Sequence, residues 1–161
     1  MALVALLALS VTACGWHLRG SGPAAASLDG TAIVLDSRVG EGGLAREVRE
    51  ALDASGARVA EQDDQAPRLV LLEENRDRRT ISVGSQGGND EREVRYRVRW
   101  SLRSGDGETL AGPETLEQVR SYRFDRDQVL GSESRQDTLV NDMRREAAFL
   151  LMNRVQATLG D

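Results

Sequence analysis

The basic side chains are the most conspicuous chemical feature of this chain. All 21 of them are arginine, and lysine is absent. Arg95, Arg97 and Arg99 recur at every second position of one short stretch. The residues that alternate with them are Val94, Tyr96, Val98, Trp100 and Leu102. A guanidinium is a permanently charged planar fork that suits carboxylates and phosphates. The alternation therefore predicts a strand with an apolar face and a cationic face that could bind an anionic or polar partner.

Other charged residues are expected on the same cationic face. They are Arg79, Arg120 and Arg123, with the acids Glu73, Asp77 and Glu117. Two interpretations stay open. The face could be solvated, with opposite charges paired across strands for a few tenths of a kcal/mol each. Alternatively, it could dock in the hydrophilic lumen of an outer-membrane β-barrel or on a phosphorylated glycolipid.

A second reactive group is Cys14, the only cysteine, which follows an apolar run from Ala2 to Ala13. The run is too short to span a bilayer but long enough for the hydrophobic region of a secretory signal. Val11-Thr12-Ala13-Cys14 resembles the signal of bacterial lipoproteins, which implies cleavage before Cys14, an S-diacylglycerol on its thiol and an acyl chain on its new amine. Because no charge lies within residues 1–10, we expect the basic part of the signal upstream of Met1.

The sequence offers no set of residues for catalysis, so we predict no catalytic residue, metal ligand or cofactor. His17 is the only histidine, and Glu73 and Glu74 are neighbours that would point to opposite faces of a strand. A lipidated Cys14 leaves no thiol for a disulfide, a zinc site or a nucleophile. The net charge of −5 argues against a nucleic-acid-binding protein, which would carry excess positive charge.

The first half of the chain predicts a strand–helix–strand unit. Residues 31–36 are an apolar run typical of an inner strand, and residues 42–55 place apolar side chains at helical spacing before Gly56, a natural helix stop. Residues 68–74 are the second strand, so a right-handed crossover with parallel strands is expected. Residues 57–66 are interpreted as a polar connection.

The second half predicts an antiparallel meander and a long helix. Residues 80–83 continue or return from the previous strand, residues 84–90 are a turn, and strands follow at 94–102 and 115–124. The helix is expected at 133–159, with Ser134 and Asp137 as a capping pair. The fold class is therefore α+β: a β-α-β-β-β-α two-layer sandwich whose mixed sheet of about four strands carries two helices on one face. We expect a signal peptide at 1–13, a lipidated N-terminus and tether at 14–30, and a single domain at 31–161.

Three stretches together resemble the LPS-assembly lipoprotein family LptE. The first is the string after Cys14, which consists of Gly15, Trp16, His17, Leu18 and Arg19. The second is Gln136-Asp137 with Val140, Met143 and Arg144-Arg145, and the third is the step from residues 33–37 to residues 44–49. The resemblance covers the chain from Cys14 onward.

The resemblance implies a protein anchored by lipid on the periplasmic side of the outer membrane. It implies a one-to-one complex in which the protein plugs an LptD-like β-barrel, binds lipopolysaccharide and helps to insert it into the outer leaflet. Gly15 is a residue that outer-membrane sorting would tolerate. The candidates for contact with lipopolysaccharide or the barrel are Arg79, Arg92, Arg95, Arg97, Arg99 and Arg135. The alternative is a periplasm-facing lipoprotein that binds peptidoglycan or another envelope protein through its arginine-rich face.

Overall fold

A computed structural model describes residues 28–83 and 89–160. Its elements follow one another in the order β-α-β-β-β-β-α. They are β1 (Ala32–Ser37), α2 (Leu44–Ala54), β2 (Arg58–Ala60), β3 (Arg68–Val83), β4 (Asn89–Arg103), β5 (Thr109–Asp125) and α3 (Val129–Leu159). The α+β class that the sequence predicted is confirmed.

The strands form one mixed sheet in the order β2-β1-β3-β4-β5. β1 pairs in parallel with both β2 and β3, and the remaining pairs are antiparallel. The parallel pairing of β1 with β3 confirms the expected crossover. The sheet has five strands instead of about four, because β2 lies in the segment predicted as a polar connection. β2 has only three residues, too few to show periodicity, and Ala60 buries itself against Val34 and Ala66.

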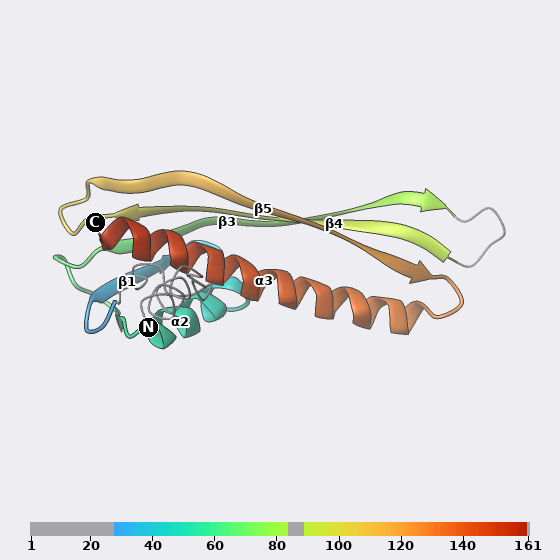
Figure 1. The fold of residues 1–161 in the computed structure, drawn as a ribbon, viewed down its shortest axis with the longest axis horizontal. Coiled ribbons are helices and arrows are strands. Elements are labelled where there is room, and N and C mark those ends of the chain that lie inside the picture. The colour runs from blue at the N-terminus through green and yellow to red at the C-terminus, as the bar shows by residue number, and fades with distance from the viewer. Residues whose placement is uncertain (1–27, 84–88, 161) are drawn as a thin grey trace, which may run out of the picture.

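The molecule is long and narrow because three strands and one helix share nearly the same length (Figure 1). β3, β4 and β5 contain 16, 15 and 17 residues, which corresponds to about 50 Å at strand rise. α3 has 31 residues and is therefore about 46 Å long. We call the end with β1 and α2 the proximal end, and the end where β5 turns into α3 the distal end.

Both helices lie on one face of the sheet, as the sequence predicted (Figure 1). The inward face of β4 is fully covered, since Val94, Tyr96, Val98 and Trp100 are at most 1% exposed. They pack in one apolar core with α2 and with the inward stripe of α3, to which Met143 and Leu151 belong. This burial fixes which side chains of the meander point away from the helices.

The helix ends differ in part from the predictions. α2 stops as expected before Gly56, whose φ of +83° is readily adopted only by glycine. α3 begins at Val129, four residues before the predicted start, and its N-cap Gln128 makes no side-chain cap. The predicted capping pair of Ser134 and Asp137 is therefore wrong. Residues 80–83 continue β3 and do not return from it.

Candidate functional site

The sheet face turned away from the helices, which we call the outer face, carries the predicted arginine stripe. The register of β3 and β5 against β4 also assigns Arg79 and Arg123 to this face. Its arginines along β3, β4 and β5 are Arg68, Arg79, Arg95, Arg97, Arg99, Arg103 and Arg123. Its acids include Glu73, Asp77, Glu91, Glu93 and Glu117. The outer face is therefore a mosaic of both charges and not a cationic surface.

Most of these arginines already have a carboxylate partner. Arg79 forms a two-pronged pair with Glu93, at 2.8 Å from Nε to Oε1 and 3.1 Å from Nη2 to Oε2. Arg97 bonds Asp77, and Arg99 Nη1 donates to Glu73 Oε1 at 3.0 Å. Arg95 lies 3.8 Å from both Glu93 and Glu117.

The arginines of these pairs are largely exposed to solvent, so the pairs stabilise the fold only weakly. Glu93 holds the pKa of Arg79 above its ordinary value through a hydrogen bond and its charge. Of the two interpretations, paired surface charges therefore describe the geometry of the outer face. A protein that docked there would face alternating hydrogen-bond donors and acceptors.

One expected member of the outer face is on the other side of the sheet. Arg120 pairs with Val94 in the β4–β5 ladder and bonds Glu146 of α3. Its placement on the outer face was wrong because Arg120 and Arg123 are three residues apart. In an unbroken strand, residues separated by an odd number point to opposite faces.

Two other predicted contact residues, Arg92 and Arg135, both lie at the distal end. The Arg92 guanidinium lies 3.2 Å above the centre of the Phe124 ring, and its buried Nε has no hydrogen-bond partner in the described part of the chain. Arg135 donates to the hydroxyl of Ser132 at 2.9 Å. The same hydroxyl accepts the backbone N–H of Asp125, the residue after Phe124, at 3.0 Å.

A third arginine, Arg78, joins them on the helix side and was not among the sequence candidates. Arg78 Nη1 donates to Gln136 Oε1 at 3.1 Å, and Tyr122 donates its hydroxyl to the same oxygen at 2.7 Å. Arg78 follows from strand alternation once Arg79 is placed on the outer face, but its partner Gln136 lies 58 residues away on α3, which a single sequence does not show. We call Arg78, Arg92 and Arg135 the distal cluster. Its partners are an aromatic ring, a hydroxyl and an amide, all neutral.

Exposed apolar side chains lie at the same end of the molecule as the distal cluster. Leu130 and Val129 at the start of α3 are 83% and 44% exposed, and Val83 and Ile81 at the end of β3 are 63% and 44% exposed. An ion pair joins β4 to the β5–α3 turn at this end. Arg126 donates from Nε and Nη2 to the two carboxylate oxygens of Asp90, at 3.0 and 2.8 Å. Cations without carboxylate partners beside exposed apolar groups suit a ligand with both an anionic and an apolar part.

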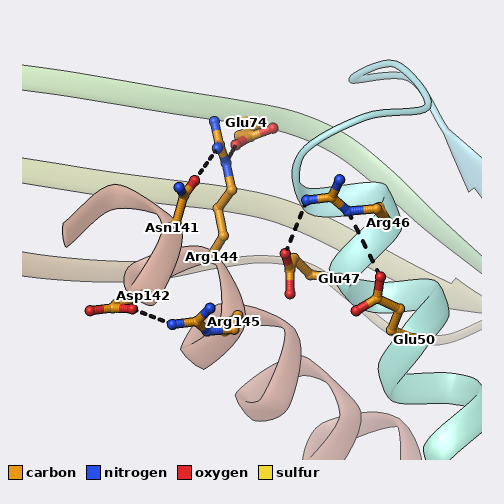
Figure 2. A network of polar contacts seen from close by, with 8 residues as sticks. All are labelled: Arg46, Glu47, Glu50, Glu74, Asn141, Asp142, Arg144 and Arg145. Carbon is orange, nitrogen blue, oxygen red and sulfur yellow. Dashed lines mark hydrogen bonds and ion pairs between the residues drawn. The ribbon is translucent and has the colours of Figure 1, made fainter. Parts of the chain in front are cut away.

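A half-buried polar network links α3 to the sheet (Figure 2). Glu74 Oε1 accepts from Arg144 Nε at 2.9 Å and from the Tyr96 hydroxyl at 2.8 Å. Burial, together with the hydrogen bond to Glu74, raises the pKa of Tyr96. Burial alone would lower the pKa of Arg144, but the hydrogen bond and charge of Glu74 reverse this and raise it.

The remaining predicted residues lie outside the described ranges. These are the lipidation site Cys14 and the string Gly15, Trp16, His17, Leu18 and Arg19. Across residues 28–83 and 89–160, no group of histidine, cysteine, aspartate and glutamate side chains could hold a metal ion. In the same ranges, neither helix has the length and apolar character needed to cross a membrane.

Comparisons with known proteins give a consistent result. The LptE family model, described as lipopolysaccharide-assembly, matches residues 32–155. The chain is 30% identical to the LPS-assembly lipoprotein LptE of Pectobacterium atrosepticum, over 95% of this chain and 83% of that protein. It is 28% identical to the protein of the same name from Photorhabdus laumondii, over 95% and 82%.

The fold agrees with the sequence matches. The crystal structure of rare lipoprotein B from Shewanella oneidensis superposes with a TM-score of 0.71 at 26% identity, covering 80% of this chain and 96% of that one. Members of the matched family assemble lipopolysaccharide and are not enzymes, which confirms the prediction of a non-enzymatic protein. The resemblance noted in the sequence is confirmed as well: this chain belongs to the LptE family of lipopolysaccharide-assembly lipoproteins.

Proposed function

We propose that this protein is a lipid-anchored component of the outer membrane that binds lipopolysaccharide at its distal end. We further propose that it docks through its outer face inside an LptD-like β-barrel, one copy to one barrel, and helps to insert lipopolysaccharide into the outer leaflet. Family membership supports the general role. The division of the surface into two sites comes from the arrangement of charges in this chain.

The proposed anchor is Cys14, acylated on its sulfur and on its amine after removal of residues 1–13. One acyl chain holds a protein to a membrane only marginally, whereas two or more hold it firmly. Mass spectrometry of protein purified from membranes tests this directly. We expect an N-terminal peptide that starts at Cys14 and carries acyl and diacylglycerol groups; a free Cys14 thiol or a retained leader would overturn the anchor.

Lipopolysaccharide is assigned to the distal end because phosphates need cations that are not already neutralised. Among the described residues, Arg92 and Arg135 contact neutral groups, whereas Arg97 and Arg99 bond carboxylates. A phosphate at the distal cluster would therefore displace no ion pair. The exposed side chains of Val83, Val129 and Leu130 would lie beside acyl chains of the same ligand. The observation that carries this assignment is that, within residues 28–83 and 89–160, neither Arg92 nor Arg135 has a carboxylate partner.

Binding measurements with matched variants test the site. A charge-assisted hydrogen bond contributes about 1.5 kcal/mol or more, so Arg92→Ala with Arg135→Ala should weaken lipopolysaccharide binding by at least about tenfold. The control is Arg97→Ala with Arg99→Ala, which removes two arginines of the outer face and should leave the affinity nearly unchanged. Added salt should weaken binding to the unaltered protein, because it screens exposed charges. Equal losses in both pairs of variants, or binding that salt leaves unchanged, would contradict the assignment.

The outer face is assigned to the barrel because it offers alternating donors and acceptors over the length of three long strands. The lumen of a membrane barrel is polar, and complementary charge sets orientation at such interfaces more than affinity. Photoreactive residues at positions 95, 97 and 99 should crosslink to one large barrel protein. Purification in mild detergent should recover that barrel, whereas recovery of cell-wall fragments or soluble proteins alone would favour the peptidoglycan or envelope-protein alternative.

A further inference from the structure

The two helices leave an open groove on the side away from the sheet. Its volume is about 400 Å³, and it runs between α2 and the second half of α3. The residues that line it are Glu47, Glu50, Ala51 and Ala54 of α2, Ser55 at its C-cap, and Arg145, Ala148, Phe149, Met152, Asn153 and Gln156 of α3. Alanines keep it open on both helices, and Phe149 is 63% exposed. This volume lies within the range of pockets that hold small ligands, which is room for one large aromatic side chain.

The rim of the groove is negatively charged on its α2 side. Glu47 and Glu50 share one cation, Arg46, at 3.5 and 3.8 Å (Figure 2). Arg145, which lines the α3 side, is already paired with Asp142 on its own helix. The α2 rim therefore carries one carboxylate more than its arginine can neutralise, and an incoming cation would be favoured there.

The described chain begins beside one end of this groove. Leu28 is 2% exposed and belongs to the main core. Gly30 N donates to Gly56 O at 2.9 Å, and Gly56 directly follows Ser55, the groove residue at the C-cap of α2. The chain thus enters the domain at the C-terminal end of α2. The residues between Cys14 and Leu28 include one tryptophan, Trp16, and one arginine, Arg19, but no acid.

We propose that the groove between α2 and α3 is the docking site of the chain's own N-terminal segment, with Trp16 seated against Phe149 and Arg19 beside Glu47 and Glu50. An extended chain covers about 3.3 Å per residue, so the twelve positions from Trp16 to Leu28 can reach well beyond the groove. From Ser55 to Glu47 the α2 wall rises only about 12 Å. The apolar side chain and the cation of the segment match the floor and the rim of the groove.

Docking would have a consequence for the anchored protein, and this consequence rests on the proposed acylation of Cys14. A free segment of 14 residues would let the domain stand about 45 Å from the membrane. A docked Trp16 leaves only Gly15 between the groove and the lipidated residue. The groove would then lie at the membrane surface, with the axis of α3 fixed relative to the bilayer.

Photocrosslinking in membranes tests the docking in the full lipidated protein. Benzoylphenylalanine replaces Phe149, an exposed aromatic residue whose substitution disturbs little packing. We expect an intramolecular crosslink to the peptide that contains Trp16. Benzoylphenylalanine in place of Leu130, at the distal end of the same helix, is the control and should not give this crosslink. Crosslinks from position 149 to a second copy, to the barrel or to no protein would each overturn the proposal.

Tryptophan fluorescence gives a second readout that does not depend on the lipid or on lipopolysaccharide. Trp100 is fully buried, so in the chain starting at residue 14 with Cys14→Ser, iodide reports on Trp16, the only other tryptophan. We expect Trp16 to be protected, and Phe149→Ser to raise its quenching severalfold while Leu130→Ser leaves it unchanged. A fully accessible Trp16, or protection that Phe149→Ser does not alter, would overturn docking even if lipopolysaccharide binding is intact.

Discussion

Replacing Arg144 by methionine should destabilise the domain strongly, because it leaves the partly buried Glu74 carboxylate without its cationic partner. The two side chains are 25% and 17% exposed, and Glu74 would keep only the Tyr96 hydroxyl as a donor. Breaking a fully buried pair costs about 3–5 kcal/mol. The partial exposure of this pair reduces the expected loss to about 2–3 kcal/mol. For a domain of this size we expect a fall in Tm of about 8–12 °C.

Urea unfolding followed by circular dichroism measures this loss. The matched control is Arg145→Met, one residue further along α3, where the guanidinium is 64% exposed and paired within its own helix (Figure 2). We expect it to cost less than about 0.5 kcal/mol. The double variant Glu74→Met with Arg144→Met should recover at least half of the loss, since no buried charge remains. A loss for Arg144→Met no larger than that for Arg145→Met would refute the reasoning.

Three further perturbations follow from single features. Because burial and Glu74 raise the pKa of Tyr96, the unfolding free energy should fall above pH of about 10 by up to about 1.4 kcal/mol per pH unit; urea titrations should show a shallower fall in Tyr96→Phe, and identical slopes would contradict this. Asp90→Asn breaks the pair with Arg126, so amide exchange at residues 126–132 should accelerate while the proximal half is unchanged; uniform acceleration would contradict a local lock. Gly56→Ala places a side chain at a φ of +83° and should cost about 1–2 kcal/mol in thermal melts, and an unchanged Tm would contradict the strain.

The parts of the fold that the sequence predicts well are those with a long, uninterrupted pattern. The alternation from Val94 to Leu102 predicted both faces of β4, because every inward residue is apolar and every outward one polar. The β-α-β crossover and the position of α3 followed from apolar spacing in the same way. β2 was missed because three residues carry no period, and the start of α3 was missed because no side chain caps it.

The candidate site was predictable only in part, because its chemistry depends on register and on distant partners. The arginines at 95, 97 and 99 are visible in the sequence, but most of the acids that pair with them, Glu73, Asp77 and Glu117, belong to β3 and β5. Their alignment with β4 includes register shifts near Leu71 and Thr80. Arg92 and Arg135 were candidates through the family resemblance alone. Their contacts with Phe124 and Ser132 depend on how the β5–α3 turn closes over the sheet.

Photocrosslinking in living cells at two positions tests the central claim, that the distal end meets lipopolysaccharide and the outer face meets the barrel. Position 130 is the most exposed apolar site beside the distal cluster, and position 97 lies in the middle of the outer-face arginines. We predict that a photoreactive residue at 130 captures lipopolysaccharide and that one at 97 captures a single large barrel protein. Lipopolysaccharide captured at 97 but not at 130 would contradict this division of the surface.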